Sequence, residues 1–203
     1  MTISNYATLQ TTVISWLHRD DANLTSLVPD FITLAEAKLN RKLRLRAQET
    51  TATGTVSATV ALPTSFIGMR SITVSAGGRN YPLTYVTPEL ITSETGQPSS
   101  YSIVGENIVF QNSSMGYTYT IVYHTPFDAL SVGVNWLITN APDVYLYSTL
   151  LEAAPYMKND KRIVTWNFLL NGDGTPENKG ALGDLIHADK MDRFGSGLAV
   201  SVR

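Results

Sequence analysis

Residues 142–157 read PDVYLYSTLLEAAPYM, and beyond the first turn this segment carries a single charged residue, Glu152. Its length and composition predict a helix, and Pro142 suits the first turn because the missing N–H of proline needs no partner there. A helix that faces water has a polar side, and this one has almost none. The helix is therefore expected to be buried on most sides, which requires other helices to cover it.

Candidate covering helices lie on both sides of this segment in the sequence. The first predicted helix has its apolar stripe at Tyr6, Leu9, Val13 and Trp16. A second is expected to begin at Pro29 and to continue to about Leu45, with an apolar stripe at Ile32, Ala35, Leu39 and Leu43. Two further amphipathic stretches follow the apolar helix, one with Ile163, Trp166, Phe168 and Leu169 and one with Leu182, Leu185 and Ile186.

The middle of the chain shows the two-residue alternation of strands. Apolar and polar residues alternate around Val56, Ala58, Val60, Leu62, Ile72 and Val74, and residues 117–123 are rich in aromatic and β-branched side chains. Gly77-Gly78 predicts a tight hairpin, and Gly105-Glu106-Asn107 predicts a three-residue one. Three prolines keep the stretch between them out of a central strand: Pro82, Pro88 and Pro98. We expect a small antiparallel sheet.

The spacing of apolar residues thus changes from helical to alternating near residue 50 and back to helical near residue 135. Amphipathic helices at the two ends need each other's apolar stripes. We therefore expect an α+β fold in which residues 1–50 and 134–194 form one helical bundle, residues 51–133 form an inserted β region, and residues 195–203 form an extended C-terminal tail.

The composition narrows the functional classes. The chain has 203 residues, a formal charge of −2 and no cysteine, which excludes disulfides and cysteine nucleophiles and gives no sign of a dedicated DNA or membrane-surface binder. Charged residues make up 16%, below the usual ~25% of soluble domains, which indicates surface that a partner covers. The sequence shows no signal peptide and no apolar run of about 18 residues, so we expect synthesis in the cytoplasm and no membrane span.

Residues typical of catalysis or metal binding do not gather into a motif. His18, His124 and His187 stand in three different parts of the chain, and no nucleophile elbow, Walker loop or dinucleotide-binding glycine pattern occurs. Residues 171–182 resemble a calcium loop only superficially, because Pro176 and Leu182 occupy positions that need glycine and a bidentate glutamate. We expect no enzyme activity, no cofactor and no metal.

Basic residues are concentrated between Lys38 and Arg46, where five of nine residues are Lys or Arg. On a helix, Lys38, Arg41 and Arg44 would lie opposite the apolar stripe. One interpretation is a solvated helix face whose cations also favour the carboxyl end of the helix. The other is a contact with a phosphate backbone or with an acidic partner surface.

Five segments, taken in order, resemble the head-to-tail adaptor family of short-tailed bacteriophages. They read TLAEAKLNRKLR at 33–44, VALPTSF at 60–66, YSIVGEN at 101–107, APDVYLY at 141–147 and LEAAPY at 151–156. The likeness extends from about residue 3 to about residue 167. Beyond residue 170 the chain departs from the family pattern, because residues 171–180 add a turn before the last helix.

The resemblance implies a virion protein without enzymatic activity, located at the head–tail junction after assembly in the host cytoplasm. Such an adaptor docks under the portal protein, forms a homo-oligomeric ring that matches the dodecameric portal, and carries the tail nozzle while allowing DNA passage. The helical bundle would face the portal and neighbouring subunits, and the β region would project outward. The tail would dock on the portal through Leu198, Ala199, Val200, Ser201, Val202 and Arg203, whose alternating apolar residues follow a Gly-Ser-Gly leader. Lys38, Arg41 and Arg44 would then line the DNA channel or a subunit seam.

Two other functional classes stay open on the sequence. A stand-alone module that binds a ligand or glycan against its tyrosine-rich strands would explain the ten tyrosines without a ring. A hydrolytic enzyme would need a site that none of the recognised motifs supplies. For the tail, the alternative is an unstructured end.

Overall fold

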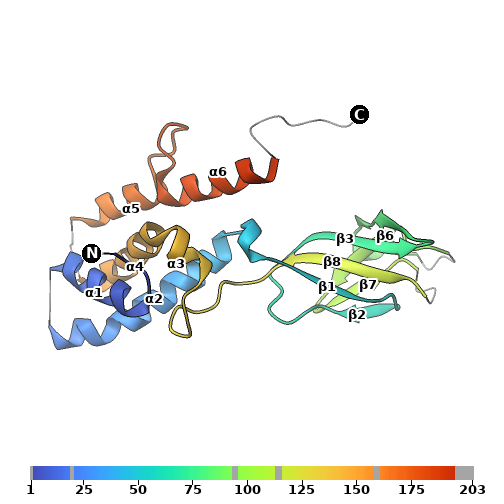
Figure 1. Cartoon of the computed structure of the whole chain (residues 1–203), viewed down its shortest axis with the longest axis horizontal. Helices are drawn as coiled ribbons and strands as arrows, with labels where there is room; N and C mark the ends of the chain where they lie inside the picture. Colours follow the sequence, from blue (N-terminus) through green and yellow to red (C-terminus); the bar gives the residue numbers. More distant parts are fainter. Residues whose placement is uncertain (1, 19–20, 93–95, 113–115, 158–160, 195–203) are drawn as a thin grey trace. The chain divides into compact units, whose positions relative to one another are not determined.

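The computed structural model describes residues 2–18, 21–92, 96–112, 116–157 and 161–194. The chain forms two compact units (Figure 1), a helical unit from residues 1–47 and 127–203 and a β unit from residues 48–126. Helices from both ends of the chain pack together, and the β unit lies between them in the sequence. The predicted α+β class, with terminal helices packed together and a small β region inserted, is confirmed.

The first helix, α1 (Tyr6–Leu17), has a capping box at its start. The side chain of Asn5 accepts a hydrogen bond from the backbone N–H of Thr8, and the Thr8 hydroxyl accepts one from the Asn5 N–H, both at 3.0 Å. Such a capping box satisfies N–H groups that have no partner inside the helix. His18 ends the helix in the left-handed conformation, with φ 52°.

The second helix, α2 (Ala22–Lys42), starts earlier than Pro29 and ends before Leu45. Its N-cap is Asp21, whose carboxylate accepts the N–H of Leu24 at 2.9 Å. The expectation that this helix begins at Pro29 is wrong. The helix begins directly after its N-cap Asp21, and Pro29 lies inside it. A proline there removes one backbone hydrogen bond, which a long and well-buried helix tolerates. The predicted apolar stripe of this helix is buried along its whole length: Ile32, Ala35, Leu39 and Leu43.

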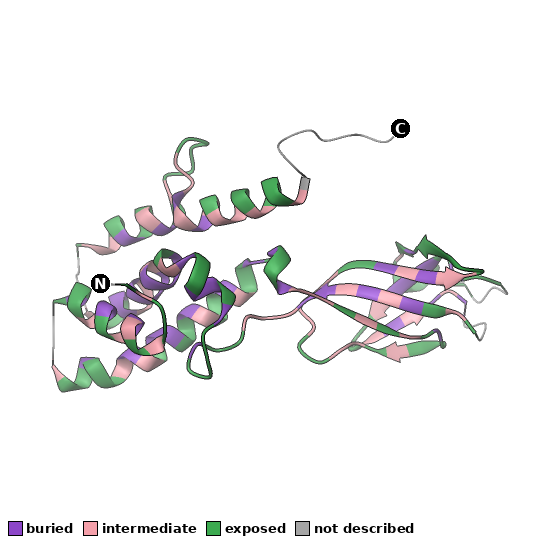
Figure 2. Cartoon of the chain, in the orientation of Figure 1, coloured by how far each residue is buried: buried purple, intermediate pink, exposed green. Residues whose placement is uncertain are grey.

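The remaining helices of the described residues are α3 (Trp136–Asn140), α4 (Pro142–Met157), α5 (Ile163–Asn171) and α6 (Gly180–Phe194). α4 contacts α1, α2, α3, α5 and α6, as its nearly uncharged sequence requires. Figure 2 shows the buried residues of the helical unit gathered where α1, α2 and α4 face one another. The core includes Leu9, Val13, Leu24, Val28, Ile32, Leu39, Val144, Tyr145, Leu150 and Ala153.

The β unit contains two four-stranded sheets. The first has the order β1 (Glu49–Thr55), β8 (Thr118–His124), β3 (Gly68–Ala76), β4 (Arg79–Pro82). The second has the order β2 (Thr59–Ala61), β7 (Asn107–Phe110), β6 (Ser100–Val104), β5 (Thr84–Tyr85). Two short 3-10 turns, η1 (Arg46–Gln48) and η2 (Pro88–Leu90), complete the described elements. Apolar side chains of both sheets share one core, which includes Val56, Ile72, Val74, Tyr101, Ile108, Phe110, Tyr119 and Ile121.

Both predicted hairpins form, with one difference in length. Gly77 and Gly78 have φ angles of 56° and 77°, the positive values that a two-residue turn between twisted strands needs. In the other hairpin Val104 pairs directly with Asn107, so the turn has two residues rather than the three expected.

Two details of the strand pattern differ from the expectation. The β5–β6 pair is parallel, because the connection over residues 86–99, which contains Pro88 and Pro98, carries the chain back before β6 begins. β1 was not expected, since its sequence ETTATGT lacks alternating apolar residues. Its partner β8 is rich in aromatic and β-branched residues, and cross-strand contacts with β8 stabilise β1 as a strand.

Candidate assembly surfaces

Two polar residues on α2 hold the chain segment that returns from the β unit. Asn40 accepts the backbone N–H of Phe127 at 2.9 Å and donates its amide to the Phe127 carbonyl at 3.4 Å. Glu36 accepts the N–H of Leu130 at 2.7 Å. Residues four positions apart share one side of a helix, so Glu36 and Asn40 act together. The returning chain is therefore fixed to α2 from its first residues in the helical unit.

A buried polar network continues from Glu36 into the core. The hydroxyl of Tyr145 on α4 donates to Glu36 at 3.1 Å and accepts the side-chain amide of Asn135 at 2.7 Å. Asn135 also accepts the N–H of Ile138 at 3.0 Å, which caps α3. Burial raises the pKa of the Tyr145 hydroxyl well above its ordinary value, and the Glu36 carboxylate raises this pKa further, whereas the Asn135 hydrogen bond acts the other way. The hydroxyl therefore stays protonated and serves as a donor.

The network fixes a loop that exposes apolar side chains. Residues 131–134, which we call the valine loop, lie between the buried Leu130 and the network member Asn135. Val132 is 86% exposed and Val134 is 62% exposed. Next to them, the ring of Trp136 stacks on Phe127 with centroids 6.0 Å apart and planes 6° from parallel. Solvent-exposed aliphatic side chains on a rigid backbone are a common feature of protein-binding surfaces.

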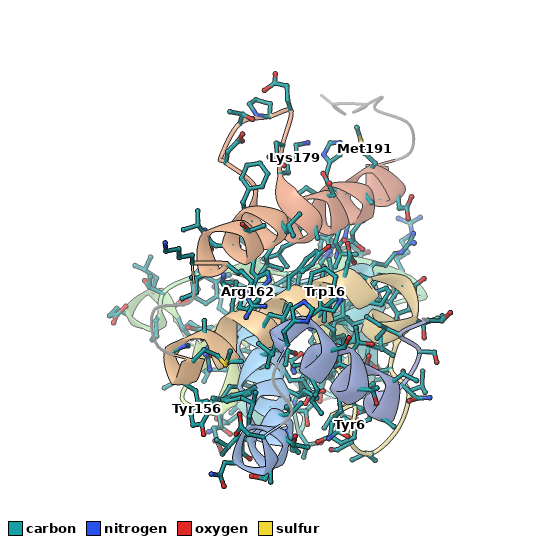
Figure 3. All side chains as sticks on the ribbon, turned by 90° about the vertical axis from the view of Figure 1, so that its left-hand side faces the viewer. Tyr6, Trp16, Tyr156, Arg162, Lys179 and Met191 are labelled. Atoms are coloured by element: carbon teal, nitrogen blue, oxygen red, sulfur yellow. The ribbon has the colours of Figure 1, made fainter. Side chains whose placement is uncertain are left out.

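A groove of about 380 Å³ opens where the end of α1 meets the start of α5. Its lining residues are Ser15, Trp16, His18, Arg162, Thr165 and Trp166, and we call it the aromatic groove. The guanidinium of Arg162 donates to the carbonyls of Trp16 at 2.9 Å and Leu17 at 3.1 Å. It also lies over the Trp166 ring, 5.1 Å from the ring centroid, in a cation–π contact. Figure 3 shows Arg162 and Trp16 side by side on one face of the helical unit.

The structure gives the basic residues predicted as a site different environments. Lys38 pairs with Glu152 of α4 at 2.5 Å, and the Glu152 side chain is only 12% exposed. Arg41 is exposed on α2, and within the described part of the chain its guanidinium has no hydrogen bond or ion pair. Arg44 lies beyond the end of α2, and its guanidinium donates to the carbonyls of Asn40 and Leu43 at 3.0 and 2.5 Å. The expected common helix face therefore holds for α2 only as far as Arg41.

Lys38 and Glu152 border a small cavity of about 220 Å³ between α2, α4, α5 and α6. Lys42, Asn167 and Asn171 also line it. The hydroxyl of Ser148 is buried at this cavity without a hydrogen-bond partner among the described residues. Lys38 thus neutralises a partly buried carboxylate, which is a structural role for one of the three predicted cations.

The C-terminal half of α6 is held mainly by hydrogen bonds and ion pairs of charged side chains. Asp189 accepts the backbone N–H of Arg46 and the side chain of Arg193, both at 2.8 Å. Arg193 donates to the Arg44 carbonyl at 3.2 Å, and Arg46 pairs with Asp192 at 3.3 Å. The basic segment after α2 therefore anchors the last helix.

The remaining predicted sites fall outside the described residues or do not assemble. The six expected portal-docking residues, Leu198–Arg203, lie outside the described residues. No three His, Cys, Asp or Glu side chains of the described chain gather where they could hold a metal ion. Within the same residues, no helix combines the length and the apolar character that crossing a membrane needs.

Three tyrosines of the β strands are buried. Tyr101, Tyr119 and Tyr123 are each less than 10% exposed and belong to the core of the β unit. Burial raises the pKa of Tyr101, and the neighbouring Tyr85 raises it further. These three tyrosines hold the two sheets together, whereas Tyr81 and Tyr85 are exposed.

Sequence reasoning missed the Glu36–Asn40 clamp and the valine loop. A signal for the clamp was present, because both polar residues directly follow buried stripe positions, Ala35 and Leu39. The valine loop had no such signal, because the exposure of Val132 and Val134 depends on contacts made by residues on either side of them.

The family model of the SU10 adaptor protein matches residues 4–200 of this chain, which is nearly its whole length. No curated protein sequence matches the chain. The order of elements agrees with the five segments that resemble head-to-tail adaptors, since 33–44 covers the last turns of α2 and 141–147 and 151–156 lie almost entirely in α4. The chain belongs to the SU10 adaptor protein family and is a bacteriophage head-to-tail adaptor.

Proposed function

We propose that this protein docks beneath the portal of a filled capsid as a ring of twelve copies and connects the portal to the tail nozzle. The family match over residues 4–200 is the observation that carries the proposal. A ring also suits the composition, since a chain with only 16% charged residues has surface to bury against neighbours.

The helical unit is the part that faces the portal and the neighbouring copies. Most of the large apolar side chains that the described residues leave exposed belong to it: Trp16, Leu34, Val132, Val134, Trp136, Tyr156, Val164, Phe168 and Met191. Where such side chains lie together, they mark protein–protein contacts. Residues 198–203 add the docking contact on the portal, as an extended peptide with alternating apolar residues.

The β unit is the outward part, on which the tail nozzle assembles. It has its own core and folds around contacts within residues 48–126. A unit with an independent core can project from a ring without weakening the helical unit. Its exposed Tyr81, Tyr85 and Leu90 supply apolar contacts for that partner.

Arg41 and Arg44 face the DNA channel or a seam between copies. A single copy carries a net charge of −2 and binds DNA weakly, but a ring concentrates one exposed Arg41 per copy around a common axis. Arg41→Gln keeps a good helix former and removes one charge per copy. If the role is DNA contact, particles assemble but retain or release the genome abnormally, with a dependence on salt. If it is a seam, assembly itself fails.

Co-assembly with the portal protein of the same phage tests the proposal. The wild-type chain is mixed with purified portal rings, and native mass spectrometry counts the copies bound. We expect twelve copies for each dodecameric portal. A chain truncated after Phe194 should keep its helical and β signals in circular dichroism and lose portal binding. A wild-type chain that leaves the portal bare would overturn the proposed function, and unchanged binding by the truncated chain would overturn the role of residues 198–203.

A further inference from the structure

We infer that the valine loop of one copy packs into the aromatic groove of the next copy around the ring. The inference rests on the proposed ring and names the contact that closes it. Both surfaces belong to the helical unit, so their relation does not depend on the β unit.

The valine loop is built to bind without further ordering. Glu36 holds Leu130 on one side of the loop, and Asn135 is held by Tyr145 and by the Asp128 carbonyl on the other, at 2.7 Å. Within the loop, the N–H of Val132 donates to the Ala129 carbonyl at 3.0 Å. Because the backbone is already fixed, burying Val132 and Val134 against a partner costs little conformational entropy.

The aromatic groove offers the apolar recess that two valines need. Its volume of about 380 Å³ is more than ten times the about 30 Å³ that one water molecule takes in the liquid. The indole of Trp16 forms one wall and is held by Tyr147, with ring centroids 6.0 Å apart. The Arg162 guanidinium lies over Trp166 and is fixed by the carbonyls that end α1. The groove is therefore preformed as well.

The charges around the two surfaces are complementary. Residues 126–157, which contain the valine loop, include no Lys or Arg, and the nearest charges in the sequence are Asp128 and Asp143. On the groove side, Arg162 lines the groove and is half-buried, and its neighbour in the sequence, Lys161, is exposed. Opposite charges around an apolar centre steer two surfaces together and disfavour loop-to-loop pairing, which would bring acidic residues face to face.

The placement of the two surfaces fits a ring rather than a closed pair. The loop precedes α3, whereas the groove lies where α1 ends and α5 begins, on a different side of the helical unit (Figure 1). A projection and a recess at separate places on one chain make a head-to-tail contact, which repeats from copy to copy until the rotation closes. Two such surfaces on a single side would give a dimer instead.

Disulfide crosslinking tests the contact directly, because the chain has no cysteine of its own. The variants Val132→Cys, Thr165→Cys and the double variant are assembled on portal rings of the same phage and mildly oxidised. Both positions are exposed, so neither change disturbs the core. We expect a ladder of covalent oligomers from the double variant, dimers only from a mixture of the two single variants, and no crosslink from either single variant alone.

Substitution of the two valines provides an independent readout. Val132→Ser combined with Val134→Ser should lower the fraction of assembled protein by roughly tenfold or more, since buried anchors carry most of the energy of an interface. Val104→Ser, at a 46% exposed valine of the β unit, is the matched control and should assemble normally.

The outcomes separate this contact from the proposed function. Val132→Cys crosslinking to itself or to the portal would overturn the head-to-tail contact, as would an assembled double variant that gives no ladder. Normal assembly of the valine double variant would do the same. In each of these cases wild-type rings still form and the proposed function stands. Failure of the wild-type chain to assemble would overturn the proposed function itself, and the contact with it.

Discussion

Asn40 and Phe127 are 87 positions apart in the sequence, yet the Asn40 side chain hydrogen-bonds both the N–H and the C=O of Phe127, at 2.9 and 3.4 Å. The pair joins the last turns of α2 to the first residue that returns from the β unit. The β insertion therefore ends at a point that the helical unit fixes by itself.

Replacing Asn40 should weaken this connection. Asn40→Ala removes both hydrogen bonds to the backbone N–H and C=O of Phe127. We expect the free energy of unfolding to fall by about 1–2 kcal/mol. Urea unfolding followed by the helical signal measures the change. Asn23→Ala, at an exposed position of the same helix, is the control and should be within about 0.5 kcal/mol of wild type. Equal stabilities of the two variants would mean that the two hydrogen bonds of Asn40 do not contribute to the stability of the folded chain.

Removal of the β unit should leave a folded helical protein. A chain in which a short Gly-Ser linker joins Ala47 to Phe127 keeps every residue of the helical core. Its helices bury their stripes against one another without the strands. We expect a cooperative thermal transition and a strongly helical circular dichroism spectrum. A spectrum without helical signal would show that the helical unit depends on the strands.

The Tyr145 hydroxyl should make stability fall at high pH. Its pKa is raised above the ordinary value of about 10 in the folded state, so its stabilisation is complete below that pH and is lost as the pH rises toward the folded pKa. Tyr145→Phe keeps the ring and removes the hydroxyl, at a cost of about 1 kcal/mol near neutral pH. Urea unfolding at about pH 8 and about pH 11 should show the difference between the two proteins shrinking. A constant difference would contradict the assignment.

The turn between α5 and α6 depends on two glycines that approach each other closely. Gly172 has φ +70° and Gly180 has φ +64°, and a Cβ at either would collide with backbone atoms of the other side of the turn. Gly174 in the same turn has φ +85° but open space around it. Gly174→Ala should cost only the strain of the left-handed conformation, about 1–2 kcal/mol. Gly172→Ala and Gly180→Ala should cost clearly more in thermal unfolding, and equal costs at all three would argue against the close approach.

Lys38 and Arg41 should respond differently to loss of charge. Lys38→Gln leaves the Glu152 carboxylate, 12% exposed, without its cation, and we expect a loss of about 1 kcal/mol because Lys38 itself is partly solvated. Arg41→Gln changes an exposed position and should alter stability by less than about 0.5 kcal/mol. Urea unfolding of both variants compares them. A greater loss at Arg41 would indicate a contact of its side chain within the chain and would contradict its exposed position.

The positions and buried faces of the main helices could be predicted from the local spacing of apolar residues. The stripe at Ile32, Ala35, Leu39 and Leu43 is buried as its spacing requires, and the nearly uncharged segment 142–157 is the central helix. These features follow from the period of the side chains, which each segment carries within itself. The α+β class and the pairing of both chain ends followed from the same periods, since each apolar stripe needs another to cover it.

The features that matter for assembly depend on contacts between distant segments. β1 is a strand because β8 pairs with it, Lys38 is neutralised by Glu152 across 114 positions, and the valine loop is held by Glu36 from α2. None of these features can be predicted from neighbouring residues. A polar segment can form a strand or a loop, a lysine can be solvated or paired, and a valine-rich turn can be exposed or covered. Tertiary packing selects one of those states by supplying the hydrogen bond, the counter-charge or the covering surface that only that state can use.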